Sequence, residues 1–225
     1  PLFSKGFRND VNIVVTALSA DQDHFIDILS IIGASAALTI SDLPFQGPIG
    51  AVRVGLIDGQ FVFNPTGSQL ENSALDLRIA GTKDAIIMVE CGANEVTEEQ
   101  MLEALQQGHA AMQAVIELQE KMRAEIGKPK REFPLHLLPA ELKTTLKEKI
   151  GNRITATIKE SGVKSERNEQ LDELKKEMIG VFTGTYEASD VAEAFEYQVK
   201  SDLRAMVLNE NRRADGRDYL TVRPI

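Results

Sequence analysis

The spacing of apolar and polar positions predicts a β-rich first half of the chain. Short apolar runs alternate there with turn signals, as in a strand meander. Asp58-Gly59 lies between two apolar runs, which is the strongest hairpin signal in the sequence. Leu75, Leu77 and Ile79 alternate with other residues, as in a half-exposed strand, whereas 11–18 is typical of a buried one. The predicted strands are residues 11–18, 51–57, 60–64, 75–80 and 85–90.

Two helices are predicted among these strands. Residues 24–41 place apolar side chains on one broad face, and the small residues at 33–37 would let the helix approach a sheet closely. Residues 97–126 have helical periodicity and begin at Thr97, which forms a capping-box pattern with Gln100. Strands with packed helices indicate an α+β fold.

The second half of the chain has helical periodicity without strand signals. Gly127 followed by Lys128-Pro129-Lys130 ends the preceding helix and marks a domain boundary. Beyond it, charged faces alternate with apolar stripes, which predicts a small all-helical bundle. Its expected helices are residues 139–149, 154–161, 166–183 and 189–208.

Composition narrows the possible partners. The 225 residues carry a formal net charge of −9, and the acidic excess lies mainly before residue 127. Tight phosphate binding needs a basic face, so this stretch alone should bind RNA poorly. No run of about 20 apolar residues could span a bilayer.

The single cysteine bears on the redox environment of the protein, and the two ends of the sequence bear on whether it is a fragment. Cys91 cannot form a disulfide within the chain, which fits a reducing cytoplasm, and we expect it to be a small buried hydrophobe. No leader of basic and then apolar residues follows Pro1, so we expect no signal peptide. Both ends lie in what looks like the middle of a structural element, which suggests a fragment.

The usual catalytic and metal-binding patterns are absent from the sequence. There is no cysteine–histidine set with zinc spacing, no phosphate-binding glycine loop and no nucleophile elbow. Asp21, Asp23 and Asp27 around His24 could begin a metal loop, but a strand-to-helix turn with capping acids is favoured. His109 falls in a helical apolar stripe and is expected to be packed.

Several strings, in this order and spacing, resemble the polynucleotide phosphorylase family. The resemblance covers residues 1–127 and 209–225 well. The helical stretch between them matches the family in position and character more than in sequence. The strings are Pro1-Leu2-Phe3 with Lys5-Gly6-Phe7 and Asn9-Asp10-Val11, Ile32 to Leu38 (IGASAAL), Gly47 to Gly55 (GPIGAVRVG), Leu75-Asp76-Leu77 through Ala80-Gly81-Thr82, Gln100-Met101-Leu102 with Gly108-His109, and Arg213 to Arg217 (RADGR) with Val222-Arg223-Pro224.

The resemblance implies a place in a larger enzyme. Members of the family degrade RNA from the 3′ end with phosphate as the attacking group, and release nucleoside diphosphates. They are homotrimeric rings that need Mg²⁺. Each subunit has two ribonuclease PH-like domains joined by a helical domain, with RNA-binding domains after them. The implied domains here are 1–128 (ribonuclease PH-like domain 1 without its N-terminal strands), 129–208 (all-helical linker domain) and 209–225 (first strand of domain 2).

The resemblance also implies that this portion lacks catalytic groups. The family's active copy holds its metal with two aspartates, whose counterparts here are Ser68 and Ala74. Asp76 is the one acid near that strand that fits the pattern, and a lone carboxylate makes a poor magnesium site. The turn that should bind phosphate carries Asp21 and Asp23, and like charge would repel the substrate.

We therefore name no catalytic, cofactor-binding or metal-binding residue. Arg213, Arg217 and Arg223 could face RNA, although packing and surface ion pairs are favoured for each. Mg²⁺ and inorganic phosphate are expected to bind outside this segment. The expected partners are single-stranded RNA, further copies in a homotrimer and other RNA-degradation proteins, with no membrane and no DNA, in the cytoplasm.

Two other interpretations stay open. The chain could be a stand-alone, non-catalytic RNA-handling scaffold, as the inert ring subunits of RNA-degrading complexes are. It could also be an active phosphorylase with a diverged site, but the missing carboxylates argue against this interpretation.

Overall fold

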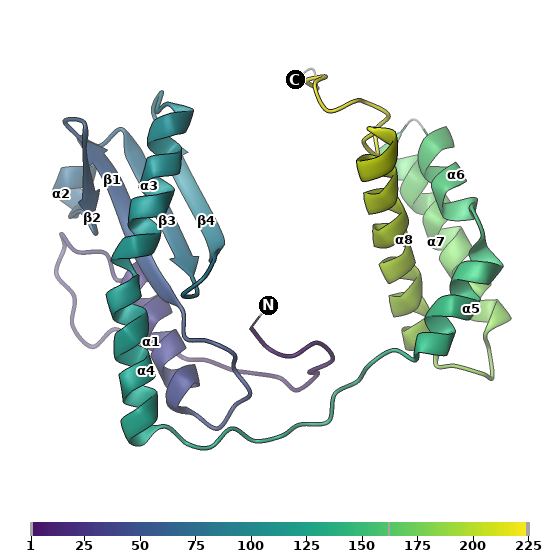
Figure 1. Ribbon diagram of the computed structural model, residues 1–225, viewed down its shortest axis with the longest axis horizontal. Coiled ribbons are helices and arrows are strands. Elements are labelled where there is room, and N and C mark those ends of the chain that lie inside the picture. Colours follow the sequence, from purple (N-terminus) through teal and green to yellow (C-terminus); the bar gives the residue numbers. More distant parts are fainter. Residues whose placement is uncertain (1, 162, 224–225) are drawn as a thin grey trace. The chain divides into compact units, whose positions relative to one another are not determined.

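The computed structural model describes residues 2–161 and 163–223 and divides the chain into two compact units. The first unit ends at His136 and the second begins at Leu137. Figure 1 shows the strands in the first unit and a helical second unit. The α+β fold class and the following helical bundle are confirmed.

Within the described residues, the first unit contains one four-stranded antiparallel sheet in the order β2-β1-β3-β4. The predicted hairpin is confirmed: Asp58 and Gly59 have φ values of 49° and 76°, and Ile57 pairs with Gln60. Positive φ at both central residues gives a type I′ turn, which matches the twist of the flanking strands. The strands are β1 (Gly50–Ile57), β2 (Gln60–Phe63), β3 (Leu75–Gly81) and β4 (Ile86–Ala93).

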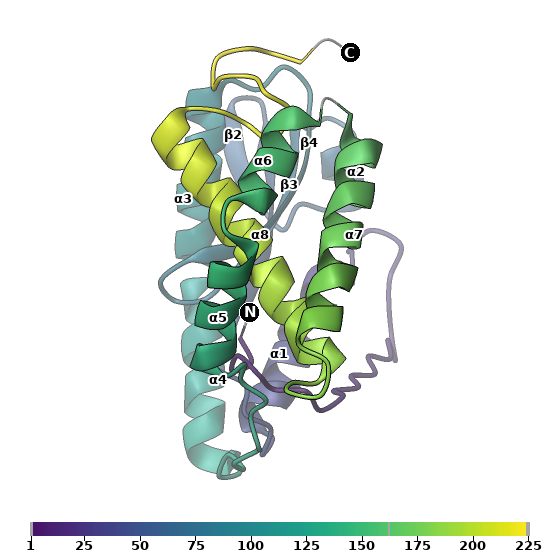
Figure 2. The same cartoon turned by 90° about the vertical axis from the view of Figure 1, so that its right-hand side faces the viewer.

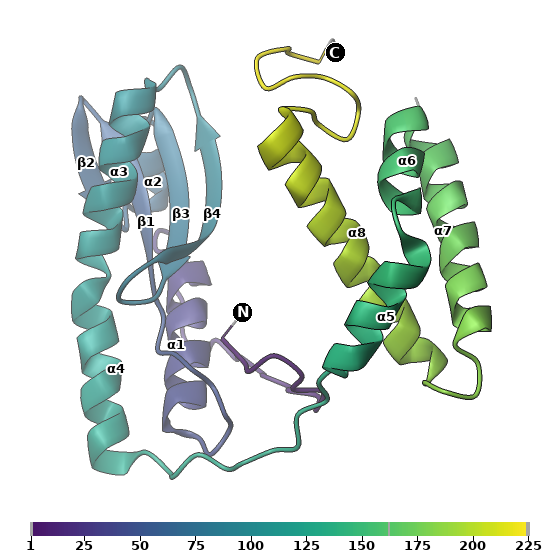
Figure 3. The same ribbon diagram turned by 45° about the vertical axis from the view of Figure 1, so that its right-hand side comes forward.

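Helices cover both faces of this sheet (Figure 3). The capping box at Thr97 is confirmed, and the helix it begins is broken at Met112 into two. The first of the two approaches the sheet closely, because a Cβ built on Gly108 would lie 2.7 Å from Ile79 Cδ1. The helices are α1 (Asp27–Ile40), α2 (Gly67–Leu70), α3 (Glu98–Ala111) and α4 (Gln113–Ile126).

The main core of the first unit lies between the sheet and α3 with α4. Alternate strand positions point to this side, and most of them are almost fully buried. Ala51 and Ala80 point to the opposite face, where they pack against α1. The core residues are Val52, Val54, Leu56, Leu75, Leu77, Ile79, Ala104, Met112 and Ile116.

Two sequence predictions for the first unit are wrong. Residues 11–18 form no strand, and Val14 and Leu18 are 80% and 95% exposed. A strand needs a hydrogen-bonding partner, and the described residues provide none for this run. Cys91 is exposed rather than buried: it lies on the edge strand β4, whose residues 89–93 are all exposed.

The segment after α4 belongs to the first unit. The backbone N–H groups of Lys128, Arg131 and His136 donate to the carbonyl oxygens of Ile40, Asp42 and Gly6, respectively, each at 2.8 Å. The Lys130 ammonium donates to three carbonyl oxygens at the end of α1, those of Leu38, Thr39 and Ser41. The structural division therefore falls after His136, later than the sequence boundary at residue 128.

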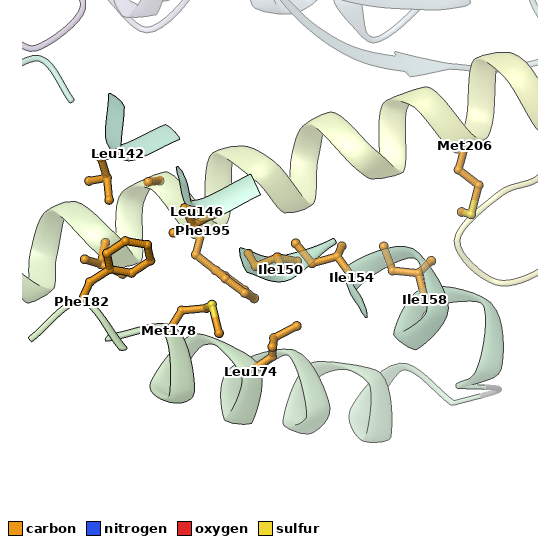
Figure 4. Packing of buried hydrophobic residues seen from close by; sticks show 12 residues of the cluster. Leu142, Leu146, Ile150, Ile154, Ile158, Leu174, Met178, Phe182, Phe195 and Met206 are labelled. Atoms are coloured by element: carbon orange, nitrogen blue, oxygen red, sulfur yellow. The ribbon is translucent and has the colours of Figure 1, made fainter. Parts of the chain in front are cut away.

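The second unit is a four-helix arrangement in its described residues (Figure 2). α8 packs against each of the other three helices. The core side chains converge between them, and Phe195 is 1% exposed among leucine, isoleucine and methionine side chains (Figure 4). The helices are α5 (Ala140–Ile150), α6 (Arg153–Glu160), α7 (Lys164–Val181) and α8 (Ala188–Glu210).

Residues 211–223 form turns and contain no strand, unlike the strand expected over 209–225. The described part of the second unit offers no strand with which they could pair. Residues 224 and 225 lie outside the described range. No helix in the described parts of the chain is both long and apolar enough to cross a membrane.

Candidate functional site

The acidic turn before α1 is held together by its own hydrogen bonds. One carboxylate oxygen of Asp21 accepts the backbone N–H groups of Asp23 at 2.8 Å and His24 at 2.6 Å. The other lies 2.7 Å from His24 Nδ1. The backbone N–H of His24 is the main cause that lowers the pKa of Asp21 to about 2. Asp21 therefore stabilises the predicted turn, but it does not cap α1, which begins after Ile26 without a side-chain cap.

Asp23 joins this turn to α2. Its carboxylate accepts the Ser68 hydroxyl at 2.6 Å and the Ser68 N–H at 3.1 Å, and its carbonyl accepts the Gly67 N–H at 2.7 Å. The hydroxyl of Ser68 is the main cause that lowers the pKa of Asp23. A carboxylate with a lowered pKa is a weak base, so this contact does not activate the serine as a nucleophile.

Arg53 on β1 is the charged centre of the site, and the sequence analysis missed it. The residue is 7% exposed. Its Nε and Nη2 donate to the two carboxylate oxygens of Asp76 at 2.7 and 2.8 Å, and its Nη1 lies 3.5 Å from Asp27. The guanidinium also lies 4.1 Å from the ring centroid of Phe25. The alternation of β1 could have indicated it, because Arg53 is the one charge in an otherwise apolar run.

A pocket of about 330 Å³ lies between the start of α1, β1 and α4. Its wall is mainly apolar, and Arg53 Nη1, which lies 3.5 Å from Asp27, is buried without a hydrogen-bond partner. The lining residues are His24, Phe25, Asp27, Ile28, Leu29, Ile32, Arg53, Asn64, Pro65 and Val115.

The carboxylates of this region do not fit a magnesium site. Hydrogen bonds from Arg53 are the main cause that lowers the pKa of Asp76, and they occupy both of its oxygens. Ser68 lies on α2, and Ala74 packs against the main core. Across the described residues, no group of three or more His, Cys, Asp or Glu side chains could hold a metal ion.

Most of the other residues singled out in the sequence have structural partners. His109 is partly buried, as predicted, with Nε2 2.9 Å from the carbonyl oxygen of Thr82. Arg213 donates to the carbonyl oxygen of Tyr219. Arg217 pairs with Asp215 at 2.8 Å, and Arg223 is exposed.

Comparisons with known proteins identify both units. Residues 47–111 match the family model "3′ exoribonuclease family, domain 2", and residues 141–218 match "Polyribonucleotide nucleotidyltransferase, RNA binding domain". These matches cover the sheet with α3 and most of the helical unit. The fold is therefore that of a 3′ exoribonuclease-family domain followed by a helical domain.

Curated relatives match over the whole chain, and each is named polyribonucleotide nucleotidyltransferase. Identity is 46% to the protein from Thermus thermophilus, 43% to that from Heliobacterium modesticaldum and 43% to that from Chloroflexus aggregans. The matches cover 100% of this chain but only 33%, 32% and 31% of these relatives. The chain belongs to the polyribonucleotide nucleotidyltransferase family and spans about a third of the length of these members.

Proposed function

We propose that this chain is a non-catalytic structural portion of an enzyme that degrades RNA from the 3′ end by phosphorolysis. The enzyme would transfer nucleotidyl groups from the RNA end to inorganic phosphate and release nucleoside diphosphates. Mg²⁺ and phosphate would bind in a part of the protein outside residues 1–225. Its partners would be single-stranded RNA and two further copies in a homotrimer, in the cytoplasm.

The state of Asp76 carries this proposal. A magnesium ligand must offer free carboxylate oxygens, whereas both oxygens of Asp76 accept hydrogen bonds from Arg53. The neighbouring acids Asp21 and Asp23 are likewise committed to the turn and to Ser68. In place of a reaction centre, these contacts fasten the start of α1 to α2 and to the sheet.

The domain assignment is part of the same proposal. Residues 1–128 would be the later part of a ribonuclease PH-like domain, 129–208 the helical linker domain and 209–225 the start of a second ribonuclease PH-like domain. The lengths of the relatives support this arrangement over a stand-alone scaffold, because the chain accounts for only about a third of them.

Phosphorolysis assays test the proposal. The full-length product of the gene that encodes this chain would be compared with its Asp23→Ala and Ser68→Ala variants. The assay would follow nucleoside diphosphate release from single-stranded RNA, phosphate and Mg²⁺. We expect each variant to keep kcat within about threefold, because neither group would touch the reacting atoms; removal of a true general base costs about 10²–10⁴-fold.

The 225-residue chain by itself should release no nucleoside diphosphate. Activity that survives its repurification, or a loss of 100-fold or more in either variant, would show that this portion contains a reaction centre.

A further inference from the structure

The C-terminal end of α1 lacks the groups that usually cap a helix. Ser41 has an extended backbone (φ −71°, ψ 170°), so no left-handed residue closes the helix, and the described last turn contains no basic residue. The last carbonyl oxygens of a helix have no partner within it, and the negative end of the helix dipole favours a nearby cation. Partners for these carbonyl groups must therefore come from another part of the chain.

Two lysines after α4 supply those partners. The carbonyl oxygens of residues 38–41 all accept hydrogen bonds from Lys128 and Lys130. The backbone N–H of Lys128 donates to Ile40 at 2.8 Å, and the Lys130 ammonium donates to the other three at 2.8, 3.1 and 2.7 Å. An ammonium has three N–H donors, so all of them are used. Lys130 thus supplies a cation to the end of α1 from 89–92 positions further along the chain.

The segment that carries these lysines has few other contacts. We call residues 128–136 the strap; the structure describes all of them, and they form no helix or strand between α4 and α5 (Figure 1). Except for Lys130 and Phe133, which are partly covered, their side chains are exposed. The Phe133 ring packs edge-on against Phe7, with 5.3 Å between the ring centroids. Few buried contacts and exposed hydrogen bonds are typical of a segment that opens locally while the rest of the domain stays folded.

Lys130 makes the strongest of the contacts that hold the strap. Hydrogen bonds from an ammonium are about twice as strong as those between neutral groups, and Lys130 makes three of them. The ion pair of Arg131 with Asp42 contributes little, because the Arg131 side chain is 62% exposed. Desolvation is the main cause that lowers the pKa of Lys130, so an ammonium left there without its acceptors would be unfavourable. The Lys130 contacts therefore decide whether the strap stays bound.

The far end of the strap coincides with the division between the two units. His136 is the last residue of the first unit, and its backbone N–H donates to the carbonyl oxygen of Gly6 at 2.8 Å. With the strap bound, the helical unit is attached to the first unit at His136. With the strap released, the attachment falls back to the end of α4, and the extended strap adds up to about 30 Å of reach.

We propose that the strap is releasable, that Lys130 is the latch that holds it on the C-terminal end of α1, and that its release lengthens the tether of the helical unit. The helical unit is the part of the chain that matches a family model described as an RNA binding domain. Release changes how far this unit can move, while the sheet and its core stay folded.

Hydrogen exchange in the full-length protein tests the latch. Lys130→Met keeps an apolar stem and removes the charge. The amides of Lys128, Arg131 and His136 should then exchange about 10–100-fold faster, and by a common factor, because the strap opens as one segment. The Leu77 amide of β3 is the internal control and should exchange at its wild-type rate.

Three results of this experiment would overturn the proposal. Unchanged exchange in the strap would mean that Lys130 does not hold it. Acceleration that includes Leu77 would mean that the variant destabilises the whole first unit. Acceleration at Arg131 with His136 still protected would mean that the strap is not released as far as the helical unit.

Lys128→Met is the matched control. Lys128 is exposed and donates to α1 through its backbone N–H, so this change removes the same charge from the strap and leaves the latch in place. Its strap amides should exchange within about twofold of the wild-type rates, as for other surface substitutions. An acceleration equal to that of Lys130→Met would mean that the overall charge of the strap holds it, and would refute a latch at Lys130.

Chemical rescue separates the ammonium from the packing of the lysine stem. A glutamate-specific protease cleaves after the exposed Glu132 only when the strap is released, so cleavage of Lys130→Ala should be about 10–100-fold faster than that of wild type. n-Propylammonium replaces the missing methylene groups and the ammonium, and it should slow this cleavage. Tetramethylammonium, a cation without N–H donors, should not. Equal cleavage of Lys130→Ala in the two salts, with wild type as the control for the protease, would overturn the assignment of the latch to the ammonium.

Discussion

Removal of the Asp76 carboxylate should destabilise the first unit by about 2–3 kcal/mol. Breaking a buried ion pair costs about 3–5 kcal/mol, because the remaining charge stays buried without its partner. Arg53 is 7% exposed and loses two hydrogen bonds in Asp76→Ala, but it keeps Asp27 at 3.5 Å. The Asp76 side chain is 34% exposed, so water can enter its place, which lowers the expected loss below the fully buried range.

A double-mutant cycle in the full-length protein measures this coupling. Urea unfolding of wild type, Asp76→Ala, Arg53→Met and the double variant gives the four free energies of unfolding. The double variant should lose less than the sum of the single losses by about 1–3 kcal/mol, since neither charge is then left alone. Additive losses, or a loss below about 0.5 kcal/mol in Asp76→Ala, would refute the reasoning.

The Arg53–Asp76 pair makes the free energy of unfolding depend on pH. Arg53 holds the pKa of Asp76 below its ordinary value of 3.8 in the folded protein. The folded state therefore binds this proton less readily than the unfolded state, and the stabilisation is fully present above pH 3.8. It is lost as the pH falls through the lowered pKa. The stability difference between wild type and Asp76→Ala should thus be constant from pH 5 to 7 and shrink in more acidic solution.

Three further predictions concern the core, a helix cap and the cysteine. Phe195→Ala should lower the free energy of unfolding of the helical unit by about 3–5 kcal/mol, so that this unit unfolds at a lower urea concentration. The far-UV signal of the sheet should keep its own midpoint, and a single unchanged transition would contradict this. Thr97→Ala should cost about 1 kcal/mol through loss of the capping box, whereas Thr97→Ser should cost less, and equal losses would rule out the hydroxyl as the cause. The Cys91 thiol is exposed, so it should react with a thiol reagent in the native protein, and because desolvation raises its pKa the reaction should become faster at higher pH; a thiol that reacts only after unfolding would be buried instead.

Part of the candidate site could be predicted from the sequence. A turn stabilised by Asp21 could be predicted from the cluster of acids shortly before a helix, because its contacts are local. The contact of Asp23 with Ser68 spans 45 positions, and that of Arg53 with Asp76 spans 23. No local pattern encodes such pairs, because they depend on how α2 and β3 are placed beside the turn and β1.

The sequence by itself determined the class of this protein and most of its elements. The hairpin at Asp58-Gly59, the capping box at Thr97 and the helices of the second unit are local or periodic features, and backbone sterics and apolar spacing suffice to specify them. The ordered motifs were enough to indicate the family that the comparisons identify.

Tertiary structure alone decided which of these elements are covered. Residues 11–18 and Cys91 have the composition of buried strands, yet both are exposed. Burial depends on whether another layer lies over a residue, and on the edge strand β4 residues 89–93 are all exposed. Tertiary structure also decides what a charged side chain can bind. Asp76 is unsuited to a metal because the fold places Arg53 against both of its oxygens.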